Sequence, residues 1–210
     1  MREPRAAEPL KAEPLKKGAR AADDSALRVR AARLASSPYG TALAAGWGFA
    51  EALSWPVLPE VALAALCVAD PRSGPRLAAS AAAGSVAGGA VAYSLARAGV
   101  DVPAPLTTDR MRTAVAEQMA AEGPHGVRHQ PLAGIPYKLY AARAGRDGLG
   151  AAEFAKASAR ARGTRILTAG LALAAFGAAA RGRRRHYPAY LAAVGAGFTG
   201  ALALIVRGWR

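Results

Sequence analysis

The chain has 210 residues, of which 52% are hydrophobic and only 6% aromatic, and its 28 Lys and Arg against 14 Asp and Glu give a net charge of +14. The charges are segregated, because residues 77–96, 166–180 and 187–206 contain none. About 20 apolar residues in a helix rise about 30 Å, the thickness of a hydrocarbon core, so this pattern favours a membrane protein. An Ala-rich soluble bundle is the alternative, but a soluble helix shows a polar stripe that these windows lack.

The basic excess does not indicate a nucleic-acid-binding protein. The densest cluster, RGRRRH at residues 181–186, lies between two apolar segments, where membrane proteins place cytoplasmic loops. Such a cluster also attracts anionic lipid headgroups. No aromatic stacking platform or nucleic-acid-binding motif accompanies it. We therefore expect membrane lipids as partners and no nucleic acid.

Residues 1–37 are charged and include the tandem pentapeptide AEPLK at residues 7–11 and 12–16. Its prolines discourage a continuous helix. The segment has no compact apolar core of the kind found in a cleavable signal peptide. We expect residues 1–37 to be a disordered basic tail on the cytoplasmic side of the membrane.

Residues from about 41 to 69 form an apolar segment with a break in its middle. Pro56 and Pro59 interrupt the helix there, and Glu51 and Glu60 flank the break. Neither half is long enough to cross a bilayer, so the segment is typical of a re-entrant helical hairpin or a discontinuous span. A carboxylate at bilayer depth is costly unless it is protonated or paired. Glu51 is therefore a candidate functional residue, whereas Glu60 can also be explained as a favourable charge at a helix N-terminus.

The next element is a predicted helix over residues 77–98. It contains Gly84, Gly88 and Gly89, which let a neighbouring backbone approach closely. A polar helix over residues 107–122 follows. A threonine is available to cap its N-terminus, and a glycine ends it.

A second broken apolar segment runs from about residue 128 to residue 145. Pro131 and Pro136 interrupt it, and Lys138 follows the break. Paired broken segments of this kind indicate the midplane site of a transporter. The candidate rim residues of that site are Arg128, His129 and Arg143. Residues 151–165 are expected to form a basic amphipathic connection, and helices over residues 165–181 and 187–206 close the chain.

Several of these features occur together in one known family. They are Glu51, Pro56, Pro59 and Glu60, the GSVAGG run at residues 84–89 followed by Tyr93, and GIPYKLYAARAG at residues 134–145 followed by Phe154 and Arg162. The pattern resembles the DedA superfamily, also described as SNARE-associated or VTT-domain proteins, and in particular its YqaA-like branch of small bacterial inner-membrane proteins. The resemblance covers roughly residues 45–180. It implies two re-entrant hairpins that meet near the bilayer centre.

The resemblance also implies a function and a set of site residues. It implies movement of phospholipids or lipid-linked phosphates between leaflets, linked to protons or ion gradients. Glu51 and Glu60 match the acidic positions of the first hairpin, and Lys138 matches a basic position after the proline of the second. The family has a pair of arginines around that proline, whereas this chain has Arg128 or His129 before it and Lys138 after it. We expect Glu51 or Glu60 to lie opposite Lys138 and to switch between ion-paired and protonated forms.

The sequence thus predicts an all-α membrane protein, a polytopic helical bundle of the inner membrane with two re-entrant helical hairpins. The expected function is a flippase- or scramblase-type transporter of lipids or lipid-linked phosphates, with coupling to protons as one mechanism. The alternative is a non-transporting membrane scaffold or envelope-biogenesis protein. The sequence is compatible with a homo-oligomer as well as with a monomer. We expect no enzyme and no cofactor, because no Ser, His, Asp constellation is present. No metal site is expected, because the single Cys67 and the scattered His125, His129 and His186 do not group as ligands.

Overall fold

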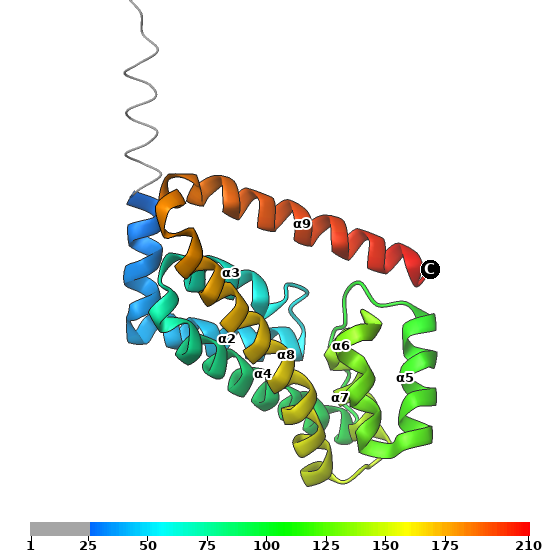
Figure 1. Ribbon diagram of the computed structural model, residues 1–210. Helices are drawn as coiled ribbons and strands as arrows, with labels where there is room; N and C mark the ends of the chain where they lie inside the picture. The colour runs from blue at the N-terminus through cyan, green and yellow to red at the C-terminus, as the bar shows by residue number, and fades with distance from the viewer. Residues whose placement is uncertain (1–25) are drawn as a thin grey trace, which may run out of the picture.

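The computed structural model describes residues 26–210, except for the side chains of Arg184 and Arg185, and over this range the chain is helical with no strand (Figure 1). The expectation of an all-α fold is confirmed. The helices after residue 37 are α2 (Pro38–Leu53), α3 (Pro59–Ala69), η1 (Pro71–Ser73), α4 (Gly74–Arg97), α5 (Asp109–Glu122), η2 (Gly123–His129), α6 (Gln130–Ala133), α7 (Tyr137–Arg146), α8 (Ala151–Ala179), η3 (Ala180–His186) and α9 (Tyr187–Gly208).

Within the described residues, three helical stretches are long and apolar enough to cross a membrane: Pro71–Arg97, Ala151–Arg183 and Tyr187–Gly208. They agree with the expectation of a membrane protein. The 16 residues of α2 and the 11 residues of α3 extend only about 24 Å and about 17 Å, less than the hydrocarbon core requires. The re-entrant hairpins and the number of spans stay predictions.

Part of the predicted N-terminal tail is helical. Residues 26–36 form a helix instead of belonging to a disordered segment. Arg28 Nη1 donates to the Ala69 carbonyl at 3.2 Å, Arg76 Nη2 donates to the Ala35 carbonyl at 2.8 Å, and the Ala35 side chain is fully buried. The stretch contains no proline, so nothing prevents the helix and its small residues pack on the bundle. The rest of the predicted tail, residues 1–25, lies outside the described residues.

Helices α2 and α4 pack at backbone contact distance. A Cβ atom at Gly84 would collide with the Ala45 carbonyl, and one at Gly48 would collide with the Ala81 carbonyl. Gly88 meets α2 in the same way. Small residues at a helix interface permit this approach, which holds α2 in a fixed position on the membrane-length helix α4.

The sequence indicated that residues 151–165 form a separate connection before a helix at residues 165–181, and this prediction was wrong. They are the first half of α8, which runs without interruption from Ala151 to Ala179. Alanine and arginine favour helix, and the stretch lacks proline. Phe154, Ser158, Arg162 and Ile166, spaced four residues apart, are all buried, so one face of α8 enters the bundle.

The short helices between α4 and α8 are set by local signals. Thr108 caps α5 by accepting a hydrogen bond from the Met111 amide at 3.3 Å, and Gly123 ends α5 with a φ of +57°. Gly134 adopts a left-handed φ of +65° after α6, and Pro136 precedes α7 in an extended conformation. The second proline-containing segment is therefore broken at residues 134–136.

Helix α9 lies along one side of the molecule and is fastened near both ends (Figure 1). Near its start, the Tyr187 hydroxyl donates to the Ala65 carbonyl at 2.8 Å. Near its end, Trp209 Nε1 donates to the Ala133 carbonyl at 3.1 Å. Most apolar side chains between these points remain uncovered, as expected of a helix that faces lipid.

Candidate functional site

The two proline breaks meet at one cavity of about 210 Å³. Trp55, Pro56 and Leu58 reach it from the α2–α3 loop, and Pro131 and the residues 134–136 reach it from the α6–α7 break. Pro59 begins α3 and is buried beside this loop. Part of the remaining wall comes from α9, through Phe198, Ala201, Leu202, Ile205 and Val206, and part comes from Pro105, Leu106 and Met111. Glu51, Lys138, Arg165 and Gln130 add charge and hydrogen-bonding groups.

Lys138 joins the second broken segment to the first. Its side chain is buried, and its ammonium donates to the carbonyls of Ser54 and Trp55, the latter at 3.1 Å. These carbonyls lie at the C-terminal end of α2, where the helix dipole favours a cation. An ammonium carries three N–H donors, so one remains for a ligand in the cavity.

Glu51 pairs with Arg162, and both side chains are buried. Arg162 Nε also donates to Ser85 Oγ at 3.0 Å, and its Nη1 donates to Gln130 Oε1 at 3.4 Å. The guanidinium lies over the Tyr137 ring, 4.9 Å from its centroid. A single arginine on α8 thus contacts α2, α4, α6 and α7.

Tyr137 fills the space beside this pair. A Cβ at Gly89 would collide with the tyrosine hydroxyl, so the glycine makes room for the ring. The Tyr137 ring also stacks on Phe154, with 6.3 Å between centroids and 3° between planes. Gly89 therefore accommodates a side chain, whereas Gly84 accommodates a helix backbone.

Glu60 lies 3.0 Å from Arg165 Nε, in a half-buried ion pair. The pair is not aligned as a hydrogen bond, and neither Glu60 oxygen accepts one from the described residues. With both carboxylates ionised, Glu51 and Glu60 face the three cations Arg162, Arg165 and Lys138. The three positive charges exceed the two negative charges by one, so the site can accommodate an anion.

The ion pairs differ from the expected one. We expected Glu51 or Glu60 to pair with Lys138, but their partners are Arg162 and Arg165. The cause is the continuous helix α8, which turns both arginines towards the bundle. Glu51 and Lys138 nevertheless line the same cavity.

The three predicted rim residues lie elsewhere and do not line this cavity. Arg128 and His129 bond to Glu122 at 2.8 Å and 2.9 Å. The hydrogen bond from His129, followed by the charge of Arg128, lowers the pKa of the Glu122 carboxyl. Arg143 pairs with Asp147 at 2.6 Å on the exposed side of α7.

Sequence reasoning missed the cations on α8 as site residues. In the sequence, Arg162 belongs to the family pattern alone, and Arg165 belongs to the predicted basic connection. Two signals could have identified Arg162. It lies four residues after Ser158 on the same helical stripe, and a buried carboxylate such as Glu51 requires a cation.

Comparisons with family models, curated proteins and solved structures found no match to this chain. The resemblance to the DedA superfamily therefore stays a prediction based on the sequence pattern. Among residues 26–210, no group of three or more His, Cys, Asp or Glu side chains is arranged to hold a metal ion.

Proposed function

We propose that this protein is a polytopic protein of the bacterial inner membrane that moves phosphate-bearing lipids between leaflets, as a flippase- or scramblase-type transporter of the DedA superfamily. One observation carries the proposal. The cavity between the two proline breaks has charged groups on one side and the apolar face of α9 on the other.

These two walls suit the two parts of a lipid. Lys138 and Arg165 offer positive charge to a phosphate, and the third N–H of Lys138 is available to donate to it. Phe198, Leu202 and Ile205 of α9 offer apolar contact to the first carbons of the acyl chains. A volume of about 210 Å³ holds a headgroup and leaves the chains outside, along the uncovered surface of α9.

The carboxylates provide a route for coupling to protons. Protonation of Glu51 or Glu60 would remove the charge that Arg162 or Arg165 now faces. The released arginine would then attract the lipid phosphate more strongly. In this scheme, proton entry and headgroup binding favour one another at the same cavity.

The ion pairs also bear on the orientation in the membrane. Basic residues in loops tend to lie on the cytoplasmic side, and α8 has basic residues near both of its ends. Arg162 and Arg165 in its first half do not count as loop charges, because they form ion pairs with Glu51 and Glu60 inside the protein. The 181–186 cluster and the arginines of residues 26–36 then dominate one end. We assign this end to the cytoplasm.

A lipid-exchange assay tests the proposal. Purified protein is reconstituted into liposomes that contain a fluorescent phospholipid, and leaflet exchange is followed by quenching from outside. We expect exchange well above that of empty liposomes, and about a tenfold loss or more in Lys138→Gln, because a hydrogen bond to a charged group is worth about 1.5–3 kcal/mol. Arg160→Gln, an exposed cation on α8, is the matched control. Wild-type exchange at the level of empty liposomes would exclude a scramblase.

The buried arginine favours a second candidate, a non-transporting scaffold. Arg162 bonds Glu51, Ser85 and Gln130 within the protein, as a purely structural residue would. In that case wild-type protein gives no exchange, and Glu51→Gln changes only stability. A lipid that is chemically altered, as seen by mass spectrometry, would instead indicate an enzyme.

A further inference from the structure

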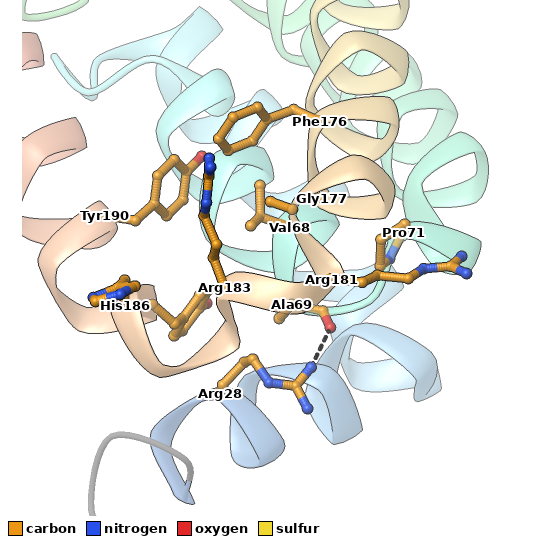
Figure 2. A pocket seen from close by; sticks show the side chains of 12 residues that line it. Arg28, Val68, Ala69, Pro71, Phe176, Gly177, Arg181, Arg183, His186 and Tyr190 are labelled. Atoms are coloured by element: carbon orange, nitrogen blue, oxygen red, sulfur yellow. Dashed lines mark hydrogen bonds between the residues drawn. The ribbon is translucent and has the colours of Figure 1, made fainter. Parts of the chain in front are cut away.

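A second cavity of about 190 Å³ lies where residues 26–36, the end of α3, the end of α8 and the start of α9 meet (Figure 2). Its basic lining residues are Arg28, Arg181, Arg183 and His186, and its aromatic lining residues are Phe176, Tyr187 and Tyr190. Of the described residues, no acidic side chain lines this cavity. The proposed transport site does not use any of these residues.

Three of these basic residues have no acidic partner among the residues that the structure describes. Within residues 26–210, no ion pair involves Arg28, Arg181 or Arg183. Asp70, beside the lining residue Ala69, instead accepts a hydrogen bond from a serine. Figure 2 shows Arg183 extending beside Tyr190 towards Phe176 and Arg28 approaching the Ala69 carbonyl.

The aromatic wall is held in place by the protein. Phe176 and Tyr190 have ring centroids 5.7 Å apart, and Tyr187 and Tyr190 have centroids 6.3 Å apart. The two tyrosine hydroxyls donate to carbonyls of α3, at 2.8 Å for Tyr187 and 3.2 Å for Tyr190. Aromatic rings beside arginines at the end of membrane-length helices are typical of the level of the lipid headgroups.

We propose that this cavity binds the phosphate headgroup of an anionic phospholipid from the leaflet next to residues 181–186. Arg183 donates to the phosphate oxygens beside the rings, Arg28 and Arg181 add positive potential, and the rings of Phe176 and Tyr190 contact the glycerol and first acyl carbons. This site is separate from the cavity between the two proline breaks, which we call the central cavity. It rests on the membrane location of the protein and not on lipid transport.

The test measures lipid binding directly. Native mass spectrometry of the full-length protein, released from nanodiscs of phosphatidylglycerol and phosphatidylcholine, compares wild type with the double variant Arg181→Gln, Arg183→Gln. We expect a preference for phosphatidylglycerol that falls about thirtyfold in the variant, because each arginine near an anionic surface contributes about a factor of five. The control is Arg207→Gln, Arg210→Gln, which removes the same charge at the other end of α9, where both side chains are exposed. It should keep the preference.

Three results would overturn the proposal: no preference for phosphatidylglycerol in wild type, equal loss in both double variants, or displacement of the lipid by millimolar inorganic phosphate, which would indicate a site for free anions. Arg183→Lys should retain most of the binding and checks that charge is the cause. Arg181 and Arg183 are exposed, so the variants should unfold at the wild-type temperature. Lipid exchange measured on the same variants should stay at the wild-type rate, which separates this site from the proposed transport function.

Discussion

Arg162 on α8 holds the carboxylate of Glu51 on α2 in an ion pair that is closed to solvent, although the two residues are 111 positions apart in the chain. The Arg162 side chain is 0% exposed and the Glu51 side chain 3%. Two charges removed from water in this way are stable only when each has its partner. The pair therefore couples the first broken segment to a membrane-length helix.

We expect Arg162→Ala to lower the free energy of unfolding by about 3–5 kcal/mol, because it leaves the Glu51 carboxylate buried and unpaired. Thermal or denaturant unfolding of the protein in detergent measures this change. Arg160→Ala, two residues earlier and exposed, should change stability by less than about 0.5 kcal/mol. Equal effects of the two substitutions would show that the ion pair does not stabilise the fold.

Replacing both partners separates structure from function. We expect Glu51→Gln combined with Arg162→Met to regain most of the stability lost in Arg162→Ala, since a neutral pair has no unpaired charge to bury. If the Glu51 carboxylate takes part in transport, the double variant should exchange lipid more slowly than wild type. Recovery of both stability and exchange would assign Glu51 a structural role only.

The pattern of apolar windows and breaks predicted much of the fold, because the signals are local. The proline breaks and the threonine cap of α5 both depend on a few neighbouring residues. For residues 26–36 and 151–165 the prediction was wrong, because their charges suggested a disordered tail and a basic amphipathic connection. In both stretches the helix is instead stabilised by packing against distant elements.

The site was only partly predictable for the same reason. Glu51 and Lys138 stood out as charges in apolar segments, and both line the central cavity. Their contacts depend on the rotation of α8 and the C-terminal end of α2, which no local pattern encodes. Arg128 and Arg143 have acidic partners close in the chain, Glu122 and Asp147, and this proximity could have argued against them as rim residues.

Gly84 should be intolerant of even a methyl group. Gly84→Ala places a Cβ against the Ala45 carbonyl, so we expect a loss of about 1–3 kcal/mol from overpacking of α2 on α4. Gly46→Ala is the control, because nothing lies within 4 Å of a Cβ at that position and alanine favours helix. Unfolding measurements should therefore give opposite signs for the two substitutions. The same sign would contradict the close packing.

Filling the central cavity should block exchange without unfolding the protein. Ile205→Trp places a larger side chain in the cavity wall, and we expect a loss of lipid exchange of about tenfold or more if the lipid enters there. Leu204→Trp is matched in size and neighbouring in sequence, but its position is 71% exposed. It should exchange lipid at the wild-type rate. Equal rates for both variants would place the lipid path elsewhere.

The Glu122 cluster predicts a pH dependence. Its lowered pKa means that the folded protein favours the ionised carboxylate, so the stabilisation is present above the ordinary pKa of 4.5 and is lost as the pH falls through the lowered value. Glu122→Gln should therefore lower the melting temperature slightly at pH 7 and not at all at strongly acidic pH. Glu117→Gln, exposed on the same helix, should show no such dependence. A constant difference across pH would contradict the pair.

The long separation between Glu51 and Arg162 has a consequence for biosynthesis. In the proposed membrane protein, the ribosome makes α2 well before α8, so the Glu51 carboxylate would reach the membrane before Arg162 is translated. During that interval, Glu51 has its lowest free energy when its carboxyl is protonated or in contact with water. Once α8 is made, Arg162 would pair with Glu51 and fix the position of α2. Correct assembly of the first third of the chain would therefore depend on the last third.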